Sequence, residues 1–157
     1  MSFRVGIGVD AHGFADGVPL VLGGVLFESP HGLAGHSDGD VLTHALIDAV
    51  LGAAGLGDIG SLFPSDGPTP EGISSLELLR DALAQVREAG YVVVNADCVL
   101  IGEQPRIASR REEMAGVLTD AVGAPVSVRA TTTDGLGFTG RGEGLAAQAV
   151  ALVDRRA

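Results

Sequence analysis

An aspartate and a histidine two residues apart, Asp10 and His12, are the first side chains whose types and spacing suggest chemistry. They stand at the end of a predicted strand, where residues two apart project from the same face and can reach one point. His44 is a third candidate, inside a predicted helix, where an imidazole needs partners for its ring nitrogens. Two histidines and one carboxylate around an open fourth position form a catalytic zinc site. Because a lone D-x-H motif is more often an isolated turn or core pair, the surrounding residues must decide.

The residues around His44 add further polar groups. The preceding segment reads His36-Ser37-Asp38-Gly39-Asp40. Helix capping and the helix dipole explain its serine and its first aspartate, but not its histidine. Asp40 lies four residues before His44 and Asp48 lies four after it, so either carboxylate could orient the imidazole ring.

A third polar cluster lies near the C-terminus, where residues 130–144 read ATTTDGLGFTGRGEG. Its hydroxyls, exposed backbone amides and one arginine suit a diphosphate group, and Asp134 could hold a hard cation such as Mg²⁺. The chain contains 24 glycines, so a glycine-rich run can arise from composition alone. This cluster therefore carries weight only together with the other two.

The elements that must position these groups follow from periodicity and turn residues. Strands are predicted over residues 3–9, 19–27, 91–101, 126–130 and 144–153, although the last segment could equally be a helix. Helices are predicted over residues 36–55, with Ser37 or Asp38 as the cap, from Ser74 or Ser75 to Gly90, and over residues 106–122. Residues 10–17 have turn composition, and residues 57–72 form a loop longer than most connections. We expect one domain over residues 1–157, an α/β (α+β) sandwich with a mixed sheet covered by about three helices.

Composition excludes several classes of function. The net charge is −10 and the chain has no lysine, so nucleic acid and anionic membranes are unlikely partners, and a lysine Schiff base or P-loop is impossible. Cys98 is the single cysteine, which excludes an internal disulfide and a cysteine-rich zinc site. The sequence has neither a long apolar stretch nor an export signal, and we expect a cytoplasmic protein.

Four motifs in one order give the chain a specific resemblance. They are G-x-D-x-H-x-F at residues 8–14, G-H-S-D-G-D at 35–40 with His44, L-G-D-I-G-x-L-F-P at 56–64, and A-T-T-T at 130–133 followed by G-F-T-G-R-G-E-G. In these the chain resembles the 2-C-methyl-D-erythritol 2,4-cyclodiphosphate synthases from Arg4 to about Val153. The resemblance implies a lyase of the non-mevalonate (methylerythritol phosphate) pathway of isoprene and terpenoid biosynthesis. It would convert 4-diphosphocytidyl-2-C-methyl-D-erythritol 2-phosphate to the 2,4-cyclodiphosphate and release CMP.

The resemblance also implies an assembly and a set of site residues. The family is a homotrimer with active sites between subunits. Zinc, one ion per subunit, would be held by Asp10, His12 and His44, and a second Mg²⁺ or Mn²⁺ by Asp134. His36 and Thr132 would stabilise the transition state. The residues expected to contact substrate are Asp10, His12, His36, Ser37, Asp58, Ile59, Gly60, Phe63, Asp66, Gly102, Arg106, Thr131, Thr132, Thr133, Asp134, Phe138 and Arg141.

The chain departs from the family pattern at three of these positions. Asp134 stands where the family usually carries glutamate, so this carboxylate is one methylene shorter. Asp66 is displaced by one position relative to the usual loop sequence, which affects the expected substrate contacts there. Arg106 replaces a common lysine, which keeps the positive charge and changes its geometry.

Two other functions are compatible with the same residues. One is a zinc-dependent hydrolase of a nucleoside diphosphate derivative, which would need an activated water and a general base such as Asp40 or His36. The other is a trimeric protein that binds an isoprenoid in a cavity on the three-fold axis, near Phe138, Arg141 and Glu143, and keeps its metal for structure. A structural zinc has no need of an open position, which favours an enzyme.

Overall fold

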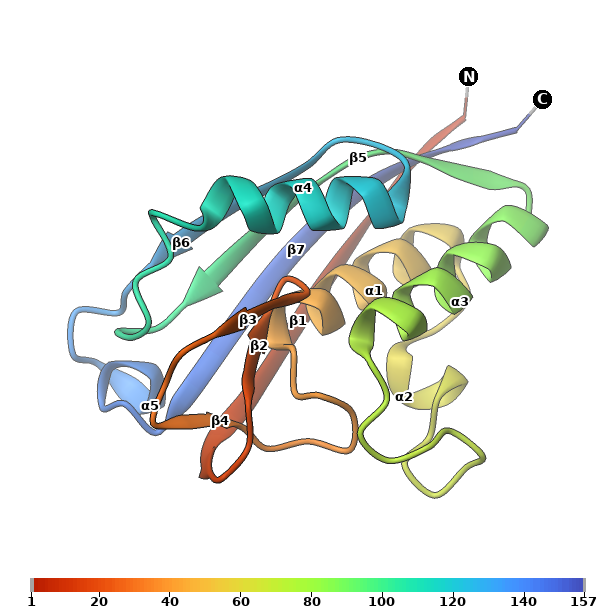
Figure 1. The fold of residues 1–157 in the computed structure, drawn as a ribbon. Coiled ribbons are helices and arrows are strands. Elements are labelled where there is room, and N and C mark those ends of the chain that lie inside the picture. Colours follow the sequence, from red (N-terminus) through yellow and green to blue (C-terminus); the bar gives the residue numbers. More distant parts are fainter. Residues whose placement is uncertain (1, 157) are drawn as a thin grey trace.

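The computed structural model describes residues 2–156. The elements follow in the order β1 (Phe3–Asp16), β2 (Leu20–Leu22), β3 (Val25–Phe27), β4 (His31–Leu33), α1 (Val41–Ala54), α2 (Ile59–Leu62), α3 (Ser75–Glu88), β5 (Tyr91–Ile101), α4 (Arg111–Val122), β6 (Val126–Thr131), α5 (Gly137–Gly140) and β7 (Gly144–Arg155). The longer helices α1, α3 and α4 lie on one side of the sheet (Figure 1). Among the described residues, no helix combines the length and the apolar character needed to span a bilayer.

A five-stranded sheet of order β4-β1-β7-β5-β6 is the framework of the molecule. Strands β5 and β6 pair in parallel, and the other neighbours pair antiparallel. The mixed sheet and the single α+β domain confirm the predicted fold class. The three predicted helices correspond to α1, α3 and α4, to which the described residues add the single-turn helices α2 and α5.

Strand β1 packs tightly against α1 because two of its inward positions are glycines. A Cβ atom on Gly6 would lie 2.0 Å from the Ala49 carbonyl oxygen, and one on Gly8 would lie 1.9 Å from that of Ala45. The outward positions between and beside them are apolar and exposed, namely Val5 (67%), Ile7 (59%) and Val9 (63%). One face of this strand therefore touches α1, and the other presents an apolar surface away from the helices.

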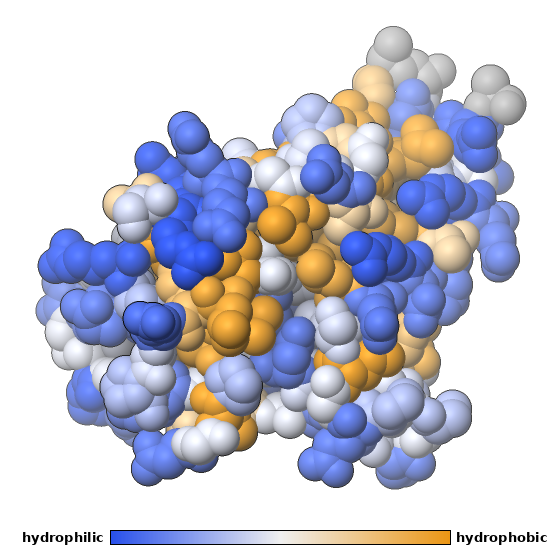
Figure 2. Space-filling view, in the orientation of Figure 1, coloured by the Kyte–Doolittle hydropathy of each residue, from blue (hydrophilic) through white to orange (hydrophobic). Residues whose placement is uncertain are grey.

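The N-terminal strands differ from the prediction in two places. Residues 10–17 were predicted as a turn, but strand β1 continues to Asp16, because it pairs with β7 as far as Gly13 and then with β4. Residues 19–27 form a hairpin of β2 and β3 rather than one strand, since Gly23 and Gly24 have φ of 59° and 73° and turn the chain. Figure 2 shows an apolar area over this hairpin, bordered by hydrophilic side chains of α4.

Helix boundaries also needed correction. Helix α1 begins at Val41 with Asp40 as its cap, so neither Ser37 nor Asp38 caps it. Helix α4 begins at Arg111, and residues 106–110, predicted to open it, contain a turn. The predicted long loop contains α2. Residues 144–155 are strand β7, which decides between the strand and helix interpretations, whereas α3, β5 and β6 lie where the sequence predicted them.

Candidate metal centre

Three side chains from two elements converge at the packed junction of β1 and α1. Asp10 and His12 project from the same face of β1, and His44 projects from α1. The Asp10 Oδ2 atom lies 2.8 Å from His12 Nε2 and 3.0 Å from His44 Nδ1. The two nitrogens lie 3.1 Å from each other. Within residues 2–156, these are the His, Cys, Asp and Glu side chains whose geometry could hold a metal ion.

The donor set and its spacing fit zinc. Ligand atoms about 2.0 Å from a tetrahedral zinc ion are about 3.3 Å apart, slightly more than the three distances measured here. The side chains are partly accessible, with 25% of Asp10, 19% of His12 and 10% of His44 exposed. Three protein ligands with access to solvent leave room for a fourth ligand from outside, as in a catalytic zinc site.

Protons would compete with a metal ion for the side chains of this triad. Burial raises the pKa of Asp10, but hydrogen bonds with His12 and His44 outweigh it and lower that pKa to about 2. The hydrogen bond with Asp10 raises the pKa of His12 above its usual value, against the effect of burial. A metal ion must displace these protons, so its binding depends on pH.

The outer nitrogen of His44 contacts two serine hydroxyls. His44 Nε2 lies 2.8 Å from Ser37 Oγ and 2.8 Å from Ser75 Oγ, and Ser75 is fully buried at the start of α3. The Ser75 hydroxyl and backbone N–H both donate to the Asp38 carboxylate. Sequence reasoning missed Ser75, because it considered that residue only as a helix start.

The expectation that Asp40 or Asp48 orients His44 is wrong. Asp40 is fully buried and accepts hydrogen bonds from the N–H groups of Gly23 and Gly24 and from both the backbone and hydroxyl of Thr43. Burial raises the pKa of Asp40. Its role is to join the β2–β3 turn to the first turn of α1, which also removes it from consideration as a hydrolytic base.

Asp48 joins α1 to the segment expected to hold the erythritol end of the substrate. Its carboxylate accepts a hydrogen bond of 2.7 Å from the Ile59 N–H. Asp58 caps α2 in a reciprocal capping box with Ser61, and Gly60 lies within that helix. Of the remaining residues expected in this segment, Phe63 ends α2 and Asp66 follows in an exposed turn.

His36 lies beside a hollow near the metal centre. Its Nε2 atom is 3.0 Å from the Thr69 carbonyl oxygen, which it can reach as a donor. The hollow measures about 340 Å³ and is also lined by Ser37 and Asp38. The predicted catalytic histidine and the predicted substrate-binding serine therefore border one space.

The residues that the family resemblance assigns to the cytidine pocket lie together at the β5–β6 edge of the sheet. Gly102, Arg106, Thr131 and Thr132 line one hollow of about 260 Å³. Two further hydrogen bonds shape the next turn, from Thr132 Oγ1 to Asp134 Oδ1 at 3.2 Å and from the Asp134 N–H to Thr132 Oγ1 at 3.3 Å. Asp134 has a left-handed backbone with φ of 52°. The hydroxyl and the carboxylate expected to act on the phosphates are thus neighbours.

Thr133 and Phe138 are less closely tied to that hollow. The Thr133 hydroxyl donates to the Leu136 carbonyl oxygen at 2.6 Å, and it also lies 2.9 Å from the Thr139 hydroxyl, so it supports the turn before α5. Phe138 on α5 is 43% exposed. Arg141 forms an exposed ion pair of 2.6 Å with Glu143.

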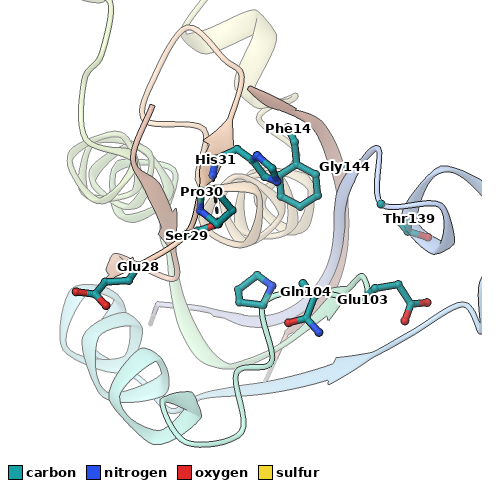
Figure 3. A pocket seen from close by; sticks show the side chains of 11 residues that line it. Phe14, Glu28, Ser29, Pro30, His31, Glu103, Gln104, Thr139 and Gly144 are labelled. Atoms are coloured by element: carbon teal, nitrogen blue, oxygen red, sulfur yellow. Dashed lines mark hydrogen bonds between the residues drawn. The ribbon is translucent and has the colours of Figure 1, made fainter. Parts of the chain in front are cut away.

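A separate hollow lies between the end of β1 and the segment after β5. It measures about 420 Å³, and its walls include Phe14, Pro30, His31 and Pro105 (Figure 3). The Phe14 and His31 rings face each other with centroids 5.2 Å apart. The side chains of Asp10, His12 and His44 do not line this space.

The strand register separates the metal centre from the expected cytidyl site. Asp10 is opposite Ala147 on β7, Ala147 is opposite Leu100 on β5, and Leu100 is opposite Ala130 on β6. Three strand spacings of about 4.8 Å place Asp10 about 14 Å from Ala130 across the sheet. Within one chain, the metal-ligand candidates and the Thr131–Thr132 hollow therefore lie apart from each other.

Comparisons with known proteins show which proteins this chain is similar to. The 2-C-methyl-D-erythritol 2,4-cyclodiphosphate synthase of Desulfatibacillum aliphaticivorans is 51% identical over 154 residues, which cover 96% of this chain and 99% of that enzyme. The bifunctional enzyme IspD/IspF of Anaeromyxobacter sp. (strain Fw109-5) is 54% identical over 96% of this chain, which spans 40% of that longer protein.

A solved structure has a fold similar to that of this chain. The 2C-methyl-D-erythritol-2,4-cyclodiphosphate synthase in its CDP-bound form is 38% identical, with a TM-score of 0.87 over 96% of this chain and 100% of its own. The model of the YgbB family matches residues 3–154, nearly the full length of the sheet and its helices. With the fold, the motifs and the convergent ligands in agreement, the chain belongs to the YgbB family.

Proposed function

We propose that the chain converts 4-diphosphocytidyl-2-C-methyl-D-erythritol 2-phosphate to 2-C-methyl-D-erythritol 2,4-cyclodiphosphate and CMP, as a phosphorus–oxygen lyase of isoprenoid precursor synthesis. The observation that carries the proposal is the convergence of Asp10, His12 and His44. It occurs in a chain that is 51% identical, over nearly its whole length, to a protein named 2-C-methyl-D-erythritol 2,4-cyclodiphosphate synthase. The hydrolase alternative is not favoured, because the buried Asp40 is fully occupied by structural hydrogen bonds.

The chemistry needs no nucleophile from the protein. The substrate's own 2-phosphate attacks the β-phosphorus, so the protein must position the two groups and stabilise the charge that develops. Asp10, His12 and His44 would hold a zinc ion, which supplies a positive charge to the β-phosphate when bound. The Thr132 hydroxyl would turn from Asp134 to donate its hydrogen to an oxygen of the same phosphate, and His36 would donate from the hollow beside the metal ligands.

Asp134 would hold a second cation, Mg²⁺ or Mn²⁺, which would bind with the substrate and supply positive charge to its phosphates. Its carboxylate already accepts from Thr132, which keeps it at the phosphate side of the turn. Because this side chain is one methylene shorter than glutamate, we propose that it reaches the cation through a water molecule. Mg²⁺ retains several of its waters in protein sites, which makes such an indirect contact feasible.

A homotrimer with active sites between subunits would bring together two half-sites, the metal ligands of one chain and the Thr131–Thr132 hollow of another. Thr132 cannot act on a phosphate at the metal centre of its own chain if about 14 Å of sheet separates them, because such a donor must lie about 3 Å from its target. The exposed apolar face of β1, with Val5, Ile7 and Val9, supports association of the sheets. A cytoplasmic location is also part of this proposal.

The reaction is tested by incubating the protein with the cytidyl substrate and Mg²⁺ or Mn²⁺ and following the products by phosphorus NMR. The cyclic diphosphate and an equal amount of CMP are expected. A linear, ring-opened phosphate product would instead indicate the hydrolase, and the absence of any turnover with zinc-loaded protein would contradict the proposed enzyme.

The shared site is tested by mixing two inactive variants in one oligomer. In His44→Ala the metal half-site is lost, and in Thr132→Ala the phosphate half-site is lost. When both chains are co-expressed with different tags and purified through both tags, some interfaces combine two intact halves and activity should return. Mixed oligomers that stay as inactive as either parent would show that both halves act within one chain.

A further inference from the structure

The outer nitrogen of His44 lies against a chain of hydrogen bonds that no part of the proposed reaction uses. His44 Nε2 is 2.8 Å from the Ser75 hydroxyl, which in turn donates to the Asp38 carboxylate. Ser75 is fully buried and comes from α3, whereas Asp38 comes from the segment before α1. The stretch that leads into α1 and the start of α3, which are distant in sequence, thus meet behind one metal ligand.

The direction of each hydrogen bond follows from the hydrogens available. An ionised carboxylate only accepts, so the single hydrogen of the Ser75 hydroxyl is committed to Asp38. Asp38 also accepts the Ser75 backbone N–H at 3.0 Å and the Asp40 N–H at 3.1 Å, which hold the carboxylate in this orientation. The Ser75 oxygen can then offer only a lone pair to His44, and it is a hydrogen-bond acceptor for an N–H group on Nε2.

We propose that Ser75 and Asp38 are positioning residues that keep a hydrogen on His44 Nε2 and so leave the lone pair of Nδ1 free for the metal. A neutral imidazole has one N–H and one bare nitrogen, and a bond to one ring nitrogen fixes which of the two can bind a metal. This inference rests on the proposed metal-dependent function and deepens it, because it names the residues that decide how His44 binds.

The opposing preference comes from Asp10. In the metal-free protein the Asp10 carboxylate lies 3.0 Å from His44 Nδ1 and favours a hydrogen there, which would block metal binding. Ser37, 2.8 Å from Nε2, can either donate or accept and does not decide the question. Ser75 is different because Asp38 has already taken its hydrogen, so the pair consistently favours the form of His44 that binds metal.

The test measures zinc affinity and the Nε2–H group itself. Zinc affinity is measured by competition with a chromophoric chelator for the wild type, Ser75→Ala, Asp38→Ala and Ser75→Thr. Loss of a residue that orients a ligating histidine typically weakens metal binding about 10- to 100-fold, and we expect this range for Ser75→Ala. Asp38→Ala frees the Ser75 hydrogen to donate to Nε2 and should weaken zinc at least as much, whereas Ser75→Thr should retain near wild-type affinity.

Ser74→Ala is the matched control, because Ser74 is the adjacent residue and its side chain makes no capping hydrogen bond. It should bind zinc as the wild type does. Proton–nitrogen NMR of histidine-labelled, zinc-loaded protein should show a slowly exchanging His44 Nε2–H in the wild type and Ser75→Thr. In Ser75→Ala this signal should exchange rapidly or vanish, which a purely structural role of Ser75 would not produce.

Two results would overturn the inference. One is unchanged zinc affinity in folded Ser75→Ala or Asp38→Ala, and the other is a slowly exchanging Nε2–H that persists in either variant. If one variant does not fold by circular dichroism, the other decides the matter, and if neither folds, a wild-type protein without a protected Nε2–H contradicts the proposal. Failure of the proposed function is distinct, since wild-type protein would then bind no zinc or would bind it without forming the cyclic product.

Discussion

Replacing Gly8 by alanine tests whether the close contact of β1 with α1 positions the metal ligands. The added Cβ would lie 1.9 Å from the Ala45 carbonyl oxygen, whereas Cβ contacts below 3.0 Å essentially never occur. Helix and strand must therefore separate by roughly 1 Å, because the added Cβ is fixed to the backbone of β1 and the carbonyl oxygen is part of the backbone of α1. Overpacking of this kind typically costs about 1–3 kcal/mol, and we expect a loss of unfolding free energy of at least about 2 kcal/mol.

The same displacement should damage the metal site. Gly8 lies two residues before Asp10 on one face of β1, and Ala45 follows His44 on α1. A shift of roughly 1 Å between these elements far exceeds the tolerance of about 0.2 Å in metal–ligand distances. Zinc affinity should therefore fall, along with stability, when both are measured on Gly8→Ala.

Urea denaturation of metal-free protein, at one fixed protein concentration, measures the free energy of unfolding. Competition with a chelator measures the zinc affinity. Gly116→Ala is the control, because no atom lies within 4 Å of the added Cβ on α4 and the change should stabilise by about 0.4–1 kcal/mol. Gly6→Ala makes an equivalent clash with Ala49, one helical turn beyond His44, and should lose stability with a smaller loss of zinc affinity. A Gly8→Ala protein with wild-type denaturation midpoint and zinc affinity would refute this account of the junction.

Four further outcomes are expected. His44→Ala should lose zinc, by elemental analysis, and nearly all activity while it stays folded; stoichiometric zinc in this variant would contradict the ligand assignment. Thr132→Ala should lower kcat by about 10²- to 10³-fold with little change in KM, and the reverse pattern would mean that Thr132 binds only the ground state. Asp134→Asn should lose activity that high Mg²⁺ or Mn²⁺ partly restores, while Asp134→Glu stays active; an unaltered metal dependence in Asp134→Asn would exclude it from the second site. Zinc affinity should fall as pH falls through the raised pKa of His12, because protons compete for its nitrogen, and an apparent affinity that stays constant between pH 5 and 8 would contradict histidine ligation.

The parts of the fold and site that the sequence predicted depend on short-range periodicity. Residues 91–101 alternate in a β-branched run and form β5 with the predicted bounds. Asp10 and His12 were predicted to share a face because the side-chain period of a strand is two, and the structure places them together. His44 was a candidate because an imidazole inside a helix needs partners for its ring nitrogens, but nothing in the local sequence shows which face of β1 that helix covers.

The parts that could not be predicted depend on contacts between distant segments. Asp38 has the composition of a cap for the helix that follows it, yet it accepts from the first N–H of α3, 37 residues later. Residues 10–16 contain glycine and aspartate and resemble a turn, but pairing with β7 and β4 keeps them extended. Local propensity is weak enough in both cases for tertiary pairing to override it.

The acidity of the chain explains why its anionic substrate would require bound cations. With a net charge of −10 and no lysine, the surroundings of the site repel a diphosphate at long range. The two proposed half-sites add Asp10 and Asp134, whose negative charges would oppose the substrate further. Arg106 lines the cytidyl hollow but no arginine is among the metal ligands or their hydrogen-bonding partners within residues 2–156. A cation held by Asp10 would reverse the sign of the local field where the β-phosphate of the proposed substrate would bind, so the carboxylate that repels the free substrate would serve to hold it.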